Sequence, residues 1–126
     1  MKGKPRPFPP LGVLDICLDV EDFSASRLFY EGLGFDWEYG EPEERWGIVI
    51  RDGVRIGLYE GHGSGNALNF RKGQIAHLSK AMEGLGHALE NHHALEDPRC
   101  GSFTVKDPDG NALFFDTAPS EMESEA

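Results

Sequence analysis

Two stretches of the chain predict strands, the first because apolar and polar residues alternate and the second because an apolar run follows a turn. The first stretch, residues 14–20, has the pattern of a half-buried strand. Its apolar side is formed by Ile16, Leu18 and Val20, and its polar side by Asp15, Cys17 and Asp19. The second stretch, residues 111–116, follows the β-forming run 103–106 and a turn at 107–110, so the two runs predict a β-hairpin. Alternation then separates Leu113 and Phe115 on one face from Ala112, Phe114 and Asp116 on the other.

Between residues 22 and 60 the pattern changes from helical to strand-like. Either Asp22 or Ser24 can cap a helix. Apolar residues recur in this helix near the helical period, at Phe23, Leu28, Phe29 and Leu33. Glycines at 32 and 34 end it, and strands follow at 36–39, 46–51 and 54–59, the last two joined by the tight turn Asp52-Gly53. One strand, one helix and three strands thus complete a first module by Glu60.

The same order of elements repeats after the glycine-rich connector 61–65. A strand at 67–71 precedes a helix at 74–85, and a strand at 87–95 and the closing hairpin follow. The inward side of the helix is predicted to carry Ile75, Leu78, Met82 and Leu85. The domain organisation we expect is an extended arm at 1–10, one α+β domain at 11–117 made of modules 11–60 and 66–117, and an acidic disordered tail at 118–126.

Composition and charge narrow the function classes. With 126 residues and 39% hydrophobic residues, the chain is large enough for one globular domain with its own core. A net charge of −10 and a pI near 4.8 argue against nucleic acid and anionic membranes as partners. No apolar run has the length of a membrane span, and the two cysteines lie far apart. We therefore expect free thiols and a cytoplasmic protein.

Three short motifs, in this order and spacing, resemble a known superfamily. They are the end of the first strand at 20–22, the segment 26–35 that reads SRLFYEGLGF, and the turn 107–111 that reads DPDGN. In these motifs and in its repeat the chain is similar to the vicinal oxygen chelate superfamily, which includes glyoxalase I, bleomycin and fosfomycin resistance proteins and extradiol dioxygenases. The resemblance covers about residues 11–117. It implies paired βαβββ modules that form a curled mixed sheet around a bay, with the helices outside, and commonly a homodimer.

The resemblance also implies where a divalent metal would bind. Metal-using members carry a ligand on each of four strands, usually His, Gln or Glu, because the ion needs converging N or O donors. Position by position, these ligand sites correspond to Asp15, to Gly57 (or Tyr59), to Ala67 (or Asn66) and to Phe114. Asp15 alone is a good donor, so we predict that no metal is used and no cofactor is needed. A non-standard site for Zn, Ni, Mn or Fe remains the alternative.

Histidines are the other candidate ligands, and their spacing matches no zinc pattern. The chain has five: His62 in the connector, His77 on the second helix, and His87, His92 and His93 in or near the sixth strand. Adjacent residues of a strand point to opposite faces, so at most one of His92 and His93 enters the bay. We expect surface or packing roles for all five.

Alternation predicts which side chains face the bay and bind a ligand. The candidates are Asp15, Cys17, Arg55, Tyr59, Asn69 and Phe114, and Trp37 and Trp46 join them as aromatic candidates whose faces alternation leaves open. Aromatic walls with a few charged groups favour a small organic molecule, aromatic or cationic, bound without metal.

The alternative is an enzyme (a lyase, isomerase or dioxygenase) with a non-standard metal site or with metal-free acid–base catalysis. In the metal-free form Asp15 would act as the base and Arg55 or Arg71 would stabilise an oxyanion. A purely structural module is the third reading.

Overall fold

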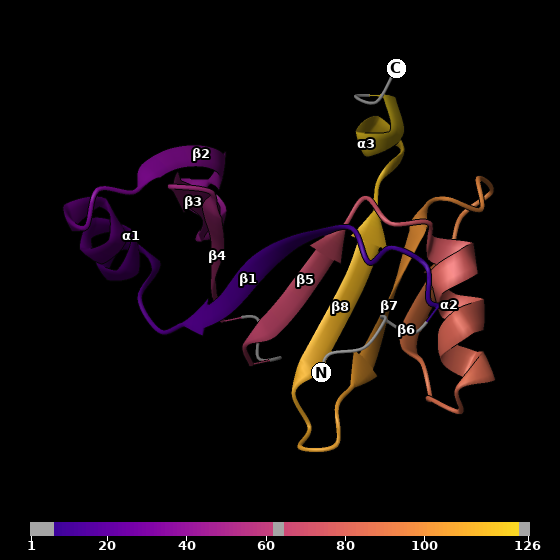
Figure 1. The fold of residues 1–126 in the computed structure, drawn as a ribbon. Helices are drawn as coiled ribbons and strands as arrows, with labels where there is room; N and C mark the ends of the chain where they lie inside the picture. The colour runs from indigo at the N-terminus through magenta and orange to yellow at the C-terminus, as the bar shows by residue number, and fades with distance from the viewer. Residues whose placement is uncertain (1–6, 62–64, 124–126) are drawn as a thin grey trace. The chain divides into compact units, whose positions relative to one another are not determined.

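The structure is a computed structural model that describes residues 7–61 and 65–123. Its strands are β1 (Val13–Val20), β2 (Asp36–Glu41), β3 (Trp46–Arg51), β4 (Val54–Glu60), β5 (Ala67–Arg71), β6 (Glu90–Ala94), β7 (Gly101–Lys106) and β8 (Ala112–Thr117) (Figure 1). Its helices are α1 (Phe23–Gly32), α2 (Ile75–Gly84) and α3 (Pro119–Glu123), with a 3₁₀ turn η1 (Pro42–Glu44). Within the described residues, none of these helices is long and apolar enough to cross a membrane.

The chain packs into two compact units, which we describe one at a time. The α1 unit consists of residues 14–69 and 106–113. The α2 unit contains the described residues of 1–13, 70–105 and 114–126. Strands β5 and β8 each begin in the α1 unit and end in the α2 unit.

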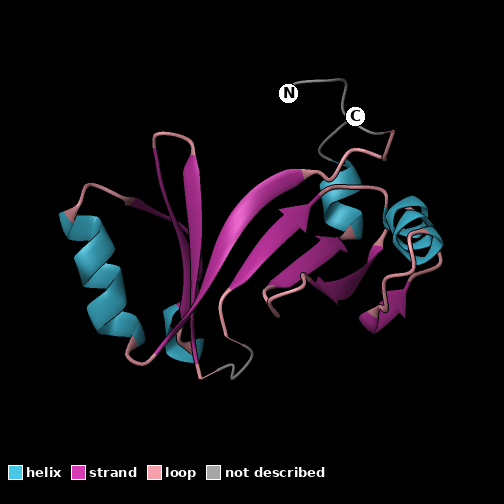
Figure 2. Cartoon of the chain, turned by 60° about the horizontal axis from the view of Figure 1, so that its bottom comes forward, coloured by secondary structure: helices cyan, strands magenta, loops and turns pink. Residues whose placement is uncertain are grey.

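In the α1 unit, α1 covers one face of a sheet ordered β2-β3-β4-β1 (Figures 1 and 2). The carboxylate of Asp22 caps the helix, because its Oδ1 accepts the backbone N–H of Ala25 at 3.0 Å. The core under the helix joins Phe23 to Val49, Ile56 and Leu58 of the strands. Strand β1 runs parallel to β4, whereas β3 is antiparallel to both β2 and β4.

Two turns of this unit follow directly from their residues. Asp52 and Gly53 connect β3 to β4 with positive φ angles of 51° and 81°, which suits a tight hairpin of the kind that the dipeptide predicts. In the turn 107–111, Oδ1 of Asp107 accepts the backbone N–H groups of Asp109 and Asn111. The amide of Asn111 donates to Oδ2 of the same carboxylate at 3.0 Å. One carboxylate therefore organises the whole turn.

In the α2 unit, the strands are ordered β5-β8-β7-β6. The rings of Phe70, Phe115 and Phe103 stack in sequence, with centroid distances of 5.0 and 4.8 Å. Phe103 and Phe115 are fully buried, as are Ile75 and Leu78 of α2 to within 1%. The backbone N–H of Lys72 donates to the carbonyl of Asp116, so the ends of β5 and β8 meet.

The predicted elements all form, and the α+β fold class is confirmed. Burial of the helices differs from the pattern, however. On α2, Ile75, Leu78 and Met82 are buried as predicted, but Leu85 is 65% exposed because it lies just past the last helical residue. On α1, Phe23 alone of the recurring apolar residues is buried, and Leu28, Phe29 and Leu33 are exposed.

The chain end also differs from the sequence prediction. Residues 119–123, which we assigned to a disordered tail, form helix α3, and the Glu121 side chain in it is only 19% exposed. The reason is an ion pair between Glu121 and Arg71, two residues that lie 50 positions apart and that no local pattern connects.

Candidate functional site

The strand register defines a second face of the α1 unit, opposite to α1, which we call the distal face. Val49, Ile56 and Leu58 point to the helix, so their strand neighbours point away from it. The register aligns Cys17 with Gly57 and Gly57 with Ile48, and it aligns Asp19 with Tyr59 and Tyr59 with Trp46. The distal face is thus formed by Asp15, Cys17 and Asp19 of β1, by Arg55, Gly57 and Tyr59 of β4, and by Trp46, Ile48 and Ile50 of β3.

One end of the distal face carries a network of charges centred on Arg55. Its Nε donates to Oδ1 of Asp15 at 2.9 Å, and its Nη1 forms an ion pair with Glu38 of β2. The Asp15 side chain is 3% exposed and that of Arg55 is 24% exposed, so the pair is largely removed from water. A buried carboxylate needs a partner of this kind, because the hydrogen bond from the guanidinium offsets the lost hydration. The two carboxylates and one guanidinium leave this end with a net negative charge.

The other end of the distal face is aromatic. The ring of Trp46 stacks on that of Tyr59 with a centroid distance of 5.9 Å and an interplanar angle of 8°. Tyr39 of β2 meets the edge of Trp46 at 5.5 Å and is 64% exposed. Stacked and edge-on pairs of this kind are favourable beyond their buried area. Three aromatic rings therefore form one continuous platform, of which we predicted Trp46 and Tyr59 but not Tyr39.

Gly57 lies between the two ends, under the ring of Tyr59. A Cβ atom at residue 57 would lie 2.6 Å from Cε2 of Tyr59 and 3.0 Å from its hydroxyl oxygen. Such distances are too short for any side chain at 57 unless the ring moves. The position that the resemblance assigns to the fourth-strand metal ligand is thus filled by the neighbouring tyrosine.

Cys17 and Asn69 meet beside this glycine. The Cys17 thiol lies 3.9 Å from Oδ1 of Asn69 in a weak S–H···O contact, and Asn69 is buried. Cys17 is a free, half-buried thiol. The structure therefore brings two of the predicted residues together as neighbours across β1 and β5.

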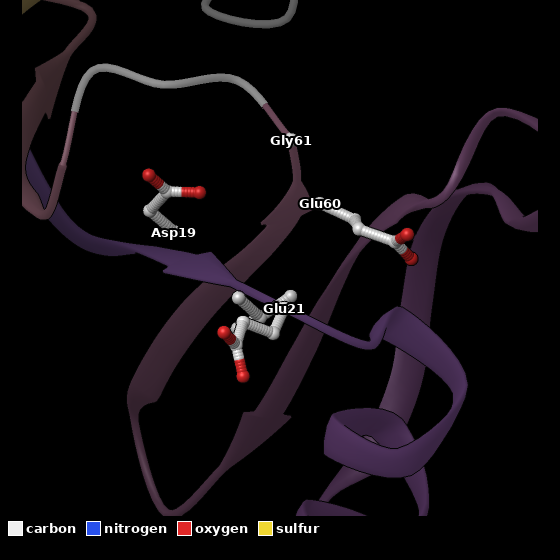
Figure 3. A pocket seen from close by; sticks show the side chains of 5 residues that line it. Asp19, Glu21, Glu60 and Gly61 are labelled. Carbon is white, nitrogen blue, oxygen red and sulfur yellow. The ribbon is translucent and has the colours of Figure 1, made fainter.

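A shallow depression of about 420 Å³ lies where β1 and β4 end, and it is lined by Asp19, Val20, Glu21, Glu60 and Gly61. Figure 3 shows the three carboxylates pointing in different directions rather than toward one point. Glu60 already accepts the Phe23 backbone N–H at 2.9 Å and pairs with Arg45. This carboxylate holds the start of α1 in place and is not arranged to bind a cation.

Trp37 does not lie on the distal face, contrary to its place among the predicted ligand-binding residues. Its ring meets Phe23 at 6.1 Å on the α1 side, and the guanidinium carbon of Arg27 lies 3.9 Å from the ring centroid. A register shift between Trp37 and Tyr39 marks a β-bulge. The bulge breaks the alternation in β2, which is why simple counting from the sequence does not give the faces of this strand.

Two further predicted residues lie in the α2 unit. Phe114 neighbours the buried Phe115 on β8 and therefore points to the opposite face. Arg71, at the end of β5, forms an ion pair with Glu121 of α3 at 2.9 Å. Glu121 was missed as a site residue because the sequence around it reads as a charged tail.

The donor groups do not fit the divalent metal that the fold family implies. The Asp15 carboxylate binds Arg55, the ring of Tyr59 occupies the space beside Gly57, and positions 67 and 114 carry Ala and Phe. Among the described residues, no three side chains of His, Cys, Asp or Glu converge to hold an ion. His77, His87, His92 and His93 are all exposed, and His62 lies outside the described residues.

Comparisons with known proteins place the fold. No family model matches the sequence, and no curated protein matches it either. Among solved structures, the chain is similar to a glyoxalase/bleomycin resistance protein/dioxygenase superfamily member from Vibrio splendidus, with 22% identity, a TM-score of 0.66, and coverage of 83% of this chain and 97% of that one.

Two other solved structures also share the fold. A protein from Legionella pneumophila described as an NAD-dependent benzaldehyde dehydrogenase gives 16% identity and a TM-score of 0.68, and covers 82% of this chain and 97% of that one. A xylose isomerase-like TIM barrel/4-hydroxyphenylpyruvate dioxygenase fusion protein gives 16% identity and a TM-score of 0.58. The match covers 96% of this chain but 22% of the fusion protein. At these identities the likeness establishes the fold and not an activity.

Proposed function

We propose that this chain, which has the fold of the glyoxalase/bleomycin resistance protein/dioxygenase superfamily, binds a small aromatic cation on the distal face without a metal. The observation that carries the proposal is the replacement of metal-ligand positions by an ion pair and an aromatic platform. Asp15 is neutralised by Arg55, and Gly57 is covered by Tyr59, which stacks on Trp46.

The chemistry of the platform supports a flat ligand. A planar ring system can continue the stack of Trp46 and Tyr59, and Tyr39 supplies an exposed edge. Charge supports a cation, because the acidic side chains of Asp15, Asp19 and Glu38 lie on or beside the distal face. A cation over aromatic faces gains further stabilisation from the ring quadrupoles. Acid–base chemistry at Asp15, by contrast, would require its carboxylate to leave Arg55.

The two tryptophans allow a direct test. Trp46 lies on the distal face and Trp37 under α1, so the variants Trp37→Phe and Trp46→Phe each leave one reporter. The probe is N-methylquinolinium, a planar aromatic cation. We expect it to quench the fluorescence of the Trp37→Phe protein in a saturable manner and to leave that of the Trp46→Phe protein unchanged.

Affinity variants complete the design. Replacing Tyr59 with Ala removes the stacking partner and should weaken probe binding about tenfold. Quinoline at pH 8 has the same ring system without the charge and should bind more weakly than the cation. Two outcomes would place the ligand elsewhere and overturn the proposal. One is saturable quenching in the Trp46→Phe protein, where Trp37 is the reporter, without quenching in the Trp37→Phe protein. The other is a Tyr59→Ala protein that binds the probe as tightly as the unsubstituted chain.

A further inference from the structure

Helix α3 carries a half-buried carboxylate, that of Glu121. Among the described side chains of residues 118–121, that of Glu121 is the one that is not exposed. Its Oε2 accepts from Nη1 of Arg71 at 2.9 Å, and its Oε1 accepts the backbone N–H of Ala118 at 2.8 Å. Glutamate is seldom buried unless it is paired. The contact with Arg71 therefore ties this short helix to the end of β5.

Arg71 lies on the face of this unit that is turned away from the phenylalanine stack. Its neighbour Phe70 belongs to the stack with Phe115, so Arg71 points to the other side of β5. The end of β8 is fixed beside it, since Thr117 donates to the carbonyl of Gly73 at 2.6 Å. The chain then turns at Ala118 and brings Glu121 back over Arg71.

This geometry is that of a bound carboxylate whose donor is part of the same chain. The Arg71 side chain is 17% exposed, and a guanidinium removed from water to this extent needs an anionic partner. Its planar donor groups match a carboxylate better than a spherical anion. A helix of five residues has little stability of its own, so the carboxylate is held chiefly by the pair that it forms.

We propose that Arg71 is a binding site for the carboxylate of a small organic acid, and that Glu121 closes this site in the free protein. A ligand carboxylate takes the place of the Glu121 carboxylate on the guanidinium, and α3 is released. No covalent step is involved. The site is independent of the aromatic platform of the α1 unit, and it uses a ligand group of opposite charge.

The test compares Glu121→Gln with the wild-type chain. Glutamine keeps an oxygen that can accept the Ala118 N–H, but it removes the negative charge that pairs with Arg71. The internal competitor for the guanidinium is then lost. Benzoate should therefore bind the variant at least about tenfold more tightly than it binds the wild-type chain. Asp97→Asn is the matched control, since it removes a carboxylate from an exposed pair with Arg99 in the same unit. Binding is measured by isothermal titration calorimetry.

Three further outcomes decide between a closed site and a purely structural ion pair. The gain in affinity should vanish in the double variant Glu121→Gln with Arg71→Gln. In the wild-type chain, saturating benzoate should speed amide hydrogen exchange at Ala118 and Glu121, whose N–H groups are hydrogen-bonded in the free protein, and leave α2 unchanged. A folded Glu121→Gln protein with no gain in affinity, or one that fails to fold, would overturn the proposal, since a displaceable carboxylate cannot be required for folding. The quinolinium experiment reports on Trp46, so either proposal can fail alone.

Discussion

At the scale of single residues, the balance of charge around Arg55 governs the distal face. One guanidinium serves two carboxylates, and the more buried of them, Asp15, depends on it most. Removal of Arg55 takes the shared guanidinium from both Asp15 and Glu38, whereas removal of Asp15 leaves Arg55 paired with Glu38 alone. The stability of this end of the sheet should therefore respond to the pair and not to its members separately.

Replacing Asp15 with Ala should lower the free energy of unfolding by about 2 kcal/mol, because Arg55 loses its buried partner and keeps only the ion pair with Glu38. The double variant Asp15→Ala with Arg55→Met should recover part of that loss, since methionine fills the space without a charge. Urea unfolding of the two single variants and the double variant measures the coupling. Additive effects would contradict a direct interaction between the two side chains.

The sequence predicted Asp15, Arg55 and Tyr59 on one face, and the register places them there. These positions lie on strands with unbroken alternation. Glu38 and Tyr39 were not predicted, and the sequence left the face of Trp37 open, because a bulge in β2 shifts the alternation by a residue. A bulge depends on the partner strand, so the sequence of β2 alone does not reveal it.

At the scale of elements, helix starts and turns are set by single carboxylates. The sequence left two caps open for α1, and the structure uses Asp22 rather than Ser24. Glu60 adds a second acceptor at the same helix start. Sequence patterns predicted these elements because the carboxylates of Asp22 and Asp107 lie within a few residues of the N–H groups that they accept. The burial of α1 and α2, by contrast, depends on the residues that pack against these helices.

Replacing Asp22 with Ala should lower the free energy of unfolding by about 1 kcal/mol, because the Ala25 N–H loses its acceptor. Ser24→Ala, two residues further on and exposed, is the matched control and should change stability by at most a few tenths of that value. Thermal unfolding followed by circular dichroism provides both values. Equal losses in the two variants would argue against the assigned cap.

The turn 107–111 should make stability depend on pH in the acid range. Hydrogen bonds from the Asn111 side chain, then from its backbone and from that of Asp109, lower the pKa of Asp107 in the folded chain. A lowered pKa contributes stability above the unfolded value near 3.8, and this contribution is lost as pH falls through the folded value. The difference in stability between wild type and Asp107→Asn should be constant above pH 5.5 or so and shrink below about pH 4.

Urea unfolding between pH 7 and pH 2.5 measures this difference. Asp109→Asn removes one negative charge from the same turn and controls for the change in net charge. A difference that stays constant down to the lowest pH would show that the Asp107 carboxylate does not stabilise the turn through its charge.

At the scale of the whole molecule, the sequence determined the fold more fully than the function. The repeated order of elements came from periodicity, and the similarity to solved structures confirms the fold. The contact between Arg71 and Glu121 was not foreseen, because it joins residues far apart in the chain through an element of only five residues. The homodimer that the resemblance implies stays a prediction, which sedimentation equilibrium checks.

Metal uptake tests the chain as a whole. After incubation with Mn, Fe, Ni or Zn salts and thorough desalting, we expect far less than one equivalent of metal by elemental analysis, because the donor positions are occupied by other interactions. Near-stoichiometric metal that disappears in Asp15→Ala would contradict this expectation. Metal retained equally in both proteins would indicate surface binding instead.

The crowding of Gly57 by Tyr59 has a consequence for how such a protein could change during evolution. A chelating side chain at residue 57 cannot enter while the tyrosine ring lies 2.6 Å from the position of its first carbon atom. Loss of the tyrosine first would break the stack with Trp46 before any metal could compensate. A chelating side chain at residue 57 therefore requires a movement of the Tyr59 ring or a second substitution at residue 59.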